Sequence, residues 1–265
     1  MYFRILLAMV IAASTFCVQA ADDTLLIFLL AGQSNMAGHG LKKDLQEELK
    51  KPLENVVIFN KVGAIIPFKP GDQHGPEVGF AHALVKAFPN RKIGIIKVAV
   101  GASSLYYDWD PDWTPEKGKA ATTENAGTGQ GMYKTLIEQA RICLEKSNGT
   151  LSGMLWMQGE SDAKHQKTAD KYGENLKAFI ERVRKDLNTP KLPFVAAQIG
   201  AEKGIYKYLE TVQKAQAELK VPNYQTVPTQ DLDRPKDGVH LDTKSLSTLG
   251  QRYAEAMEKL LTGKE

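Results

Sequence analysis

The chain has 265 residues, of which 43% are hydrophobic and 25% are charged, and its formal net charge is +3. This balance is typical of a folded protein with one large or two small domains. Because basic and acidic residues are interspersed and no basic stripe is present, nucleic acid is not expected as a partner.

The first twenty residues have the composition of a secretory signal peptide. Arg4 is followed by the apolar run ILLAMVIAASTF and then by CVQA, which ends in a small residue before ADDT. An uncleaved membrane anchor is the alternative, but the apolar run is short for a bilayer span. We therefore predict a signal peptide at 1–20, a single domain at 21–265, a secreted or periplasmic location, and no integral membrane span once the signal is removed.

Short apolar runs alternate with amphipathic segments along the rest of the chain. Strands are predicted at 24–31, 55–60, 93–100, 153–158 and 194–199, and helices at 79–88, 133–146, 170–187, 206–219 and 245–261. Continuously apolar strands are typical of a parallel sheet covered on both faces. The alternation predicts a three-layer α/β/α sandwich around a central five-stranded parallel sheet.

Three further segments carry structural expectations. The polar stretch 102–131 is expected to be a functional or mobile loop, and LKKDLQEELKK at 41–51 a solvated helix. Without the signal peptide, Cys143 is the only cysteine, so no internal disulfide can form. Its apolar helical spacing favours a packed core side chain over a nucleophile.

Polar motifs follow the strands at the points where ligands bind in an open parallel sheet. These motifs are GQSNM at 32–36, GASS at 101–104 and QGESD at 158–162, with DGVH near the end at 237–240. A serine, a histidine and a carboxylate are the parts of an acyl-transfer site, because serine needs a neighbouring base and the base needs an orienting partner.

The predicted catalytic residues are Ser34 as nucleophile, His240 as base and Asp237 as the partner of His240. The backbone N–H groups of Ser34 and Gly101 and the side-chain amide of Gln158 are predicted to stabilise the oxyanion. Each residue also has a structural alternative: Ser34 as a helix cap, His240 as a surface residue, Asp237 and Gly101 as turn residues, and Gln158 as a buried residue that satisfies backbone groups.

Met36 stands where a G-x-S-x-G elbow would have its second glycine, which argues against an ordinary α/β-hydrolase. The four motifs together resemble the SGNH hydrolase superfamily, and more narrowly its carbohydrate esterase family six and sialate O-acetylesterase-like branch. The resemblance covers about residues 24–262 and includes GPEVGFAHAL at 75–84.

This resemblance implies a flavodoxin-like α/β/α fold, no metal, no cofactor, and removal of O-acetyl groups from carbohydrates. It assigns to Ser34, Asp237 and His240 the same catalytic roles. The sequence departs from the family twice: Gln158 stands where the wider superfamily has Asn, and Ala102 follows Gly101 where a second Gly or a Thr is expected nearby.

Other residues are expected to act around the site. Gln33, Asn35 and Glu160 are predicted to support it, with Asn35 ordering the nucleophile turn and Glu160 holding the loop or orienting Gln158. Trp109, Trp113 and Tyr106, with Tyr107, are candidates for an aromatic platform under a sugar ring, and loop packing is the equal alternative.

Three functions remain open at this point. The first is an esterase of the acetylxylan esterase or sialate O-acetylesterase type. The second is an esterase that acts on a non-carbohydrate acyl ester, and the third is a non-catalytic carbohydrate-binding protein on the same fold. Neither the acetylated sugar nor the oligomeric state is predicted.

Overall fold

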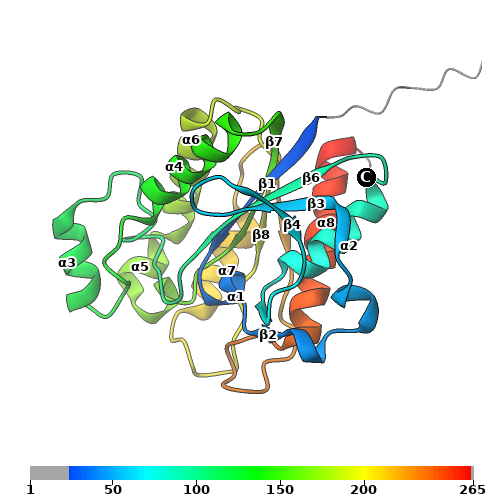
Figure 1. Cartoon of the computed structure of the whole chain (residues 1–265). Coiled ribbons are helices and arrows are strands. Elements are labelled where there is room, and N and C mark those ends of the chain that lie inside the picture. The colour runs from blue at the N-terminus through cyan, green and yellow to red at the C-terminus, as the bar shows by residue number, and fades with distance from the viewer. Residues whose placement is uncertain (1–23, 264–265) are drawn as a thin grey trace, which may run out of the picture.

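A seven-stranded sheet forms the centre of the computed structural model, which describes residues 24–263 (Figure 1). The strand order is β4-β3-β6-β1-β7-β8-β9. The strands are β1 (Leu25–Gly32), β3 (Leu53–Phe59), β4 (Ile65–Phe68), β6 (Ile93–Ala99), β7 (Gly149–Met157), β8 (Phe194–Ala197) and β9 (Tyr224–Val227). All pair in parallel except β4, which is antiparallel to β3. The predicted signal peptide at 1–20 lies outside the described residues.

The predicted architecture is confirmed, but the predicted count of five strands was wrong. All five predicted strands are present, and β4 and β9 are additional. Both are four residues long, and β4 is a mostly exposed edge strand that contains Pro67. The equally short β8 was predicted because all four of its residues are buried, whereas β4 and β9 lack a continuous buried run. The set β6-β1-β7-β8-β9 has the 2-1-3-4-5 order of flavodoxin-like folds, with β3 and β4 added at one edge.

Helices cover both faces of the sheet. The contacts of α2 (Glu77–Ala87) and α8 (Thr243–Thr262) define one layer, while α4 (Met132–Glu145), α6 (Tyr172–Asp186) and α7 (Leu209–Glu218) pack on the other face. Side chains of β1 alternate between the two cores, since Phe28 belongs to one and Leu29 to the other. Coverage on both faces explains why the strands are continuously apolar.

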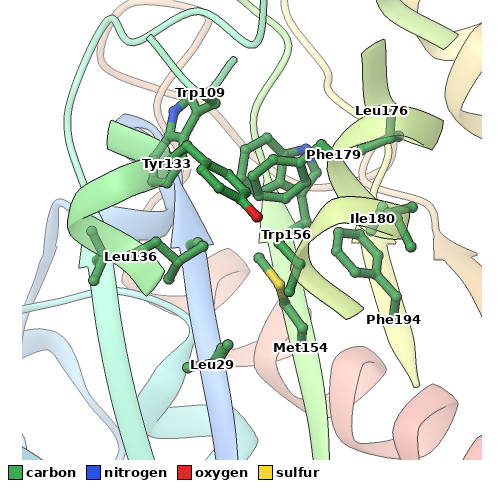
Figure 2. Packing of buried hydrophobic residues seen from close by; sticks show 14 of the residues in the cluster. Leu29, Trp109, Tyr133, Leu136, Met154, Trp156, Leu176, Phe179, Ile180 and Phe194 are labelled. Carbon is green, nitrogen blue, oxygen red and sulfur yellow. The ribbon is translucent and has the colours of Figure 1, made fainter. Parts of the chain in front are cut away.

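The core beneath α4 and α6 is rich in aromatic side chains (Figure 2). Trp156 lies between Trp109 and Phe179, with ring centroids 5.1 Å and 4.6 Å away. Cys143 is fully buried in the same cluster, and burial raises the pKa of its thiol to about 11. The prediction that Cys143 is a packed core side chain is thus confirmed.

The stretch 102–131 is not one long loop, because it contains α3 (Pro115–Thr123). Asp108, which is fully buried, organises its ends by accepting hydrogen bonds from Ser104 N, Thr128 N and Oγ1, Gly129 N and Gln130 N. A carboxylate with this many donors is a rigid anchor.

The segment 41–51 forms two 3₁₀ turns (Lys42–Asp44 and Glu47–Lys50) instead of the predicted helix. The remaining short elements are α1 (Ser34–Ala37), β2 (Gly40–Leu41), β5 (Gln73–His74), a 3₁₀ turn at Asp162–Lys164 and α5 (Gln166–Asp170). Within 24–263, no helix has the length and apolarity to cross a membrane.

Candidate active site

The carboxyl end of β1 is fixed by close approach to its two neighbours in the sheet. Gly32 has φ of +147°, and a Cβ there would lie 2.0 Å from the carbonyl oxygen of Met157, so only glycine fits. Val100 N donates to Gly32 O (3.1 Å), and Gln33 N donates to Met157 O (2.8 Å). β6 and β7 therefore hold the turn that presents Ser34, the first residue of α1, at the centre of this sheet edge.

The motif DGVH builds a carboxylate–imidazole pair within four residues. Asp237 Oδ1 accepts hydrogen bonds from the backbone N–H groups of Val239 (2.9 Å) and His240 (2.8 Å). Its Oδ2 lies 2.6 Å from His240 Nδ1. Because an ionised carboxylate only accepts, Nδ1 carries the proton and Nε2 is left as an acceptor.

Asn35 joins the Ser34 turn to the loop that carries His240. Its Nδ2 donates to Val239 O (3.1 Å) and to Glu160 Oε1 (3.0 Å), and its Oδ1 accepts from Leu241 N (2.9 Å). The side chain is therefore bonded on both sides of His240, although more than 200 residues separate the two segments in the chain. Asn35 therefore tethers the loop that carries His240 to the turn that carries Ser34.

Replacing Asn35 with alanine is expected to lower both stability and turnover. The change leaves three buried partners without their hydrogen bond, at a cost of about 2–4 kcal/mol in the free energy of unfolding. Urea denaturation and hydrolysis of an aryl acetate measure the two effects, and kcat is expected to fall at least about tenfold because the His240 loop loses its tether. The exposed Asn55→Ala variant is the control, and equal behaviour of the two variants would contradict the tethering role.

Ser34 and His240 line one pocket of about 330 Å³, together with Gly101, Ala102 and Tyr206. Within residues 24–263, no hydrogen bond occupies the backbone N–H of Ser34 or Gly101. These are two of the three predicted oxyanion donors, and both remain available to a ligand in the pocket. Ala102 has φ of +60°, so a non-glycine residue holds a left-handed conformation beside them.

The electrostatics of this pocket keep the carboxylate charged and the second histidine neutral. Burial favours the neutral form of Asp237, but hydrogen bonds from His240 and Val239 outweigh it and hold the pKa of this carboxyl well below its usual range. His39, whose ring centroid is 4.3 Å from that of His240, has its pKa lowered by burial and then by the charges of His240 and Lys236. Burial also raises the pKa of Tyr206 to about 12.

Glu160 is fully buried, and burial raises the pKa of its carboxyl. The predicted support role for Glu160 matches its bond to Asn35, although it does not contact Gln158 through a hydrogen bond. The positive charge of Arg234 acts in the opposite direction and lowers the pKa of Glu160, but burial has the larger effect.

The predicted role of the Gln158 side chain in the oxyanion hole was wrong for this structure. Gln158 is fully buried, and its Nε2 faces Ser103 O (3.0 Å), Asp162 Oδ2 (2.6 Å) and Gln33 Oε1 (3.3 Å). An amide has only two protons, and these acceptors use them. Gln158 thus ties loops together, and Gln33 does the same by accepting from Gly159 N and Ser161 N (both 3.3 Å).

Asp162, the last residue of QGESD, is a buried carboxylate that sequence reasoning did not single out. It accepts from Ser104 Oγ, Leu105 N and Tyr106 N as well as from Gln158. Burial raises its pKa to about 6, although these hydrogen bonds favour the charged form. The residue joins the loops that follow β6 and β7.

We expect Asp162 to make the protein relatively more stable in mild acid. Its pKa in the folded state lies above the ordinary value, so its contribution is fully present below about pH 4 and is lost as the pH rises through about 6. The unfolding free energy of the wild type minus that of Asp162→Asn should be about 2 kcal/mol larger at pH 4 than at pH 7. Urea denaturation at both pH values measures this difference, and the exposed Asp170→Asn is the control. A free-energy difference that is the same at both pH values, or larger at pH 7, would contradict the prediction.

The structure does not gather the predicted aromatic platform at the Ser34 pocket. Trp109 is fully buried and donates from Nε1 to Ser103 Oγ (2.8 Å), so the packing alternative holds for it. Trp113 lines a different pocket beside Tyr133, and Tyr106 is partly buried with Lys167 5.2 Å from its ring centre. Sequence reasoning missed four residues that do line the pocket: His39, Ser161, Lys164 and Tyr206. No spacing signal singles them out, because Ser161 and Lys164 follow β7 while His39 and Tyr206 come from two other segments far away in the sequence.

The comparisons with known proteins agree with this geometry. The family model described as carbohydrate esterase, sialic acid-specific acetylesterase matches residues 24–259. The probable carbohydrate esterase At4g34215 of Arabidopsis thaliana is 28% identical, in an alignment of 265 positions that covers 87% of this chain and 89% of the relative. Its crystal structure matches with a TM-score of 0.76 at 25% identity, covering 90% of this chain and 99% of that chain.

Two more solved structures share the fold. NanS matches with a TM-score of 0.70 at 16% identity over 91% of this chain and 99% of its own. XAC1771, a carbohydrate acetylesterase from Xanthomonas citri, matches with a TM-score of 0.68 at 20% identity over 90% of this chain and 57% of its own. The family model covers most of the chain, and its members are carboxylic ester hydrolases. The protein therefore belongs to the carbohydrate esterase family of sialic acid-specific acetylesterases.

Proposed function

We propose that this protein is an exported serine esterase that removes O-acetyl groups from carbohydrates through Ser34, His240 and Asp237. The observation that carries the proposal is that Ser34 and the Asp237-bound His240 line the same pocket, beside two backbone N–H groups with no protein partner within residues 24–263. A hydroxyl, a base and preorganised donors are together sufficient for acyl transfer.

The reaction follows from these positions. His240 Nε2 accepts the proton of Ser34 Oγ as the hydroxyl attacks the acetyl carbonyl, and Asp237 stabilises the imidazolium that forms. The N–H groups of Ser34 and Gly101 stabilise the tetrahedral oxyanion. His240 then gives this proton to the sugar oxygen as its bond to the acyl carbon breaks, and a water molecule activated by the same imidazole releases acetate and regenerates Ser34.

The test combines acetate release with covalent labelling of the nucleophile. Full-length mature protein is incubated with O-acetylated glycans and, separately, with a fluorophosphonate, and the labelled peptide is mapped. We expect acetate release and one label on Ser34. Glycan binding without acetate release or labelling would instead support a non-catalytic carbohydrate-binding protein.

Export is part of the proposal and rests on the residues before the domain. Cleavage after Ala20 would leave a mature chain that begins at Ala21. N-terminal sequencing of the secreted or periplasmic protein tests this point independently of activity.

A further inference from the structure

A second pocket adjoins the Ser34 pocket through a shared residue. Its volume is about 560 Å³, and its walls include Lys164, His165, Lys167, Lys207 and Tyr208. Lys164 also lines the pocket that contains Ser34 and His240. Lys167 belongs to α5, which Figure 1 shows at the same end of the sheet as α1, and Lys207 and Tyr208 directly precede α7. We call the second pocket the lysine groove.

Positive charge is concentrated in the lysine groove, whereas positive and negative residues nearly balance over the whole chain. Three lysines face one carboxylate, Glu124, although the net charge of the chain is only +3. Lys167 Nζ lies 3.5 Å from Glu124 Oε1, whereas Lys164 and Lys207 take part in none of the ion pairs found within residues 24–263. Two ammonium groups are therefore available to an anionic ligand.

Tyrosine rings contact two of the three lysines of the groove, Lys167 and Lys207. Lys167 Nζ lies 5.2 Å and 5.5 Å from the ring centres of Tyr106 and Tyr107, and Lys207 Nζ lies 5.3 Å from that of Tyr208. Lys167 Nζ also bonds Tyr107 Oη at 3.1 Å. Contacts of this kind restrict flexible lysine side chains before a ligand arrives, which lowers the entropic cost of binding.

We infer that the lysine groove binds a carboxylate-bearing sugar residue that neighbours the acetylated residue in a glycan chain. The preferred substrate is then an O-acetylated acidic oligosaccharide or polysaccharide, whose acetylated residue occupies the Ser34 pocket. Lys164, at the junction of the two pockets, contacts the chain between them. This inference rests on the proposed esterase function and adds the class of glycan on which the enzyme acts.

The test compares one acetylated chain in two charge states. O-Acetylated galacturonan oligosaccharides are used with free carboxylates and with the carboxylates converted to methyl esters, and released acetate is measured. We expect kcat/KM to be about tenfold higher for the free acid at low ionic strength, and this preference to fade in about 0.5 M salt. The double variant Lys167→Gln/Lys207→Gln should reduce the preference by about tenfold.

Controls separate this inference from the proposed function. Lys177→Gln removes the same charge from the exposed face of α6 and should leave the preference unchanged. Hydrolysis of free O-acetylated sialic acid, whose carboxylate is on the acetylated residue itself, should not respond to the double variant, and a parallel loss there would overturn the inference.

Equal kcat/KM for the acid and the methyl ester in the wild type would also overturn the inference while leaving the acetylesterase in place. If no substrate releases acetate, including an aryl acetate, the proposed function fails and the inference fails with it.

Discussion

Ser34→Ala is expected to lower kcat/KM for an aryl acetate by at least about 10³-fold while the protein remains folded. The hydroxyl makes no hydrogen bond to any residue of 24–263, so its removal costs the fold little. Gly32 and the backbone bonds to Val100 and Met157, which position the turn, are unchanged by the substitution. Without Oγ no acyl-enzyme can form, and only the donors of the pocket are left to assist water.

Steady-state kinetics and thermal unfolding of the same preparation measure this outcome. Ser147→Ala is a matched control, because it removes a serine hydroxyl from the end of α4, away from the Ser34 pocket. Retention of wild-type turnover by Ser34→Ala would remove Ser34 from the mechanism. A large drop in melting temperature would show instead that the turn needs the hydroxyl for folding.

The second large effect is expected for Asp237→Asn, with a loss of about 10²–10⁴-fold in kcat. The Asn carbonyl can still accept from the N–H groups of Val239 and His240, so the loop is expected to keep its shape. The Asn amide then faces His240 Nδ1, which must become an acceptor. The proton moves to Nε2, and the imidazole can no longer accept the proton of Ser34.

The pH dependence of kcat and the stability of Asp237→Asn test this reasoning together. Asp231→Asn is a suitable control, because it removes an exposed carboxylate that pairs with Arg252 on another part of the surface. Near-normal kcat in Asp237→Asn would show that the imidazole reaches its reactive tautomer without Asp237.

The strands β1, β3, β6, β7 and β8 and the five main helices were predictable because each carries a strong local signal. β1, for example, is apolar along its length since both faces are buried, and α8 alternates faces with helical period. The segments β4 and β9 were missed because most of their residues are not fully buried, whereas the equally short β8 is buried throughout. The pairing of β4 and β9 also depends on β3 and β8. The 3₁₀ turns at 41–51 follow from packing of Leu45 and Leu49 against the core beneath α2 and α8.

The sequence by itself determined which functional groups the site contains and the pairing of Asp237 with His240. GQSNM at the end of an apolar run and DGVH near the end of the chain specify a hydroxyl and a carboxylate–imidazole pair, because the second motif is closed by hydrogen bonds over only four residues. The glycine of GQSNM belongs to the same local signal, because the backbone conformation at Gly32 and its close approach to Met157 require a glycine.

Only the tertiary structure decided which polar and aromatic side chains face the pocket. Gln158 and Trp109 have the right chemistry for an oxyanion donor and a sugar platform, yet both are fully buried and bonded to Ser103. His39, Lys164 and Tyr206 reach the pocket from loops whose meeting depends on the order of the strands. The physical reason is that side-chain exposure is set by long-range packing, which no short window of sequence records.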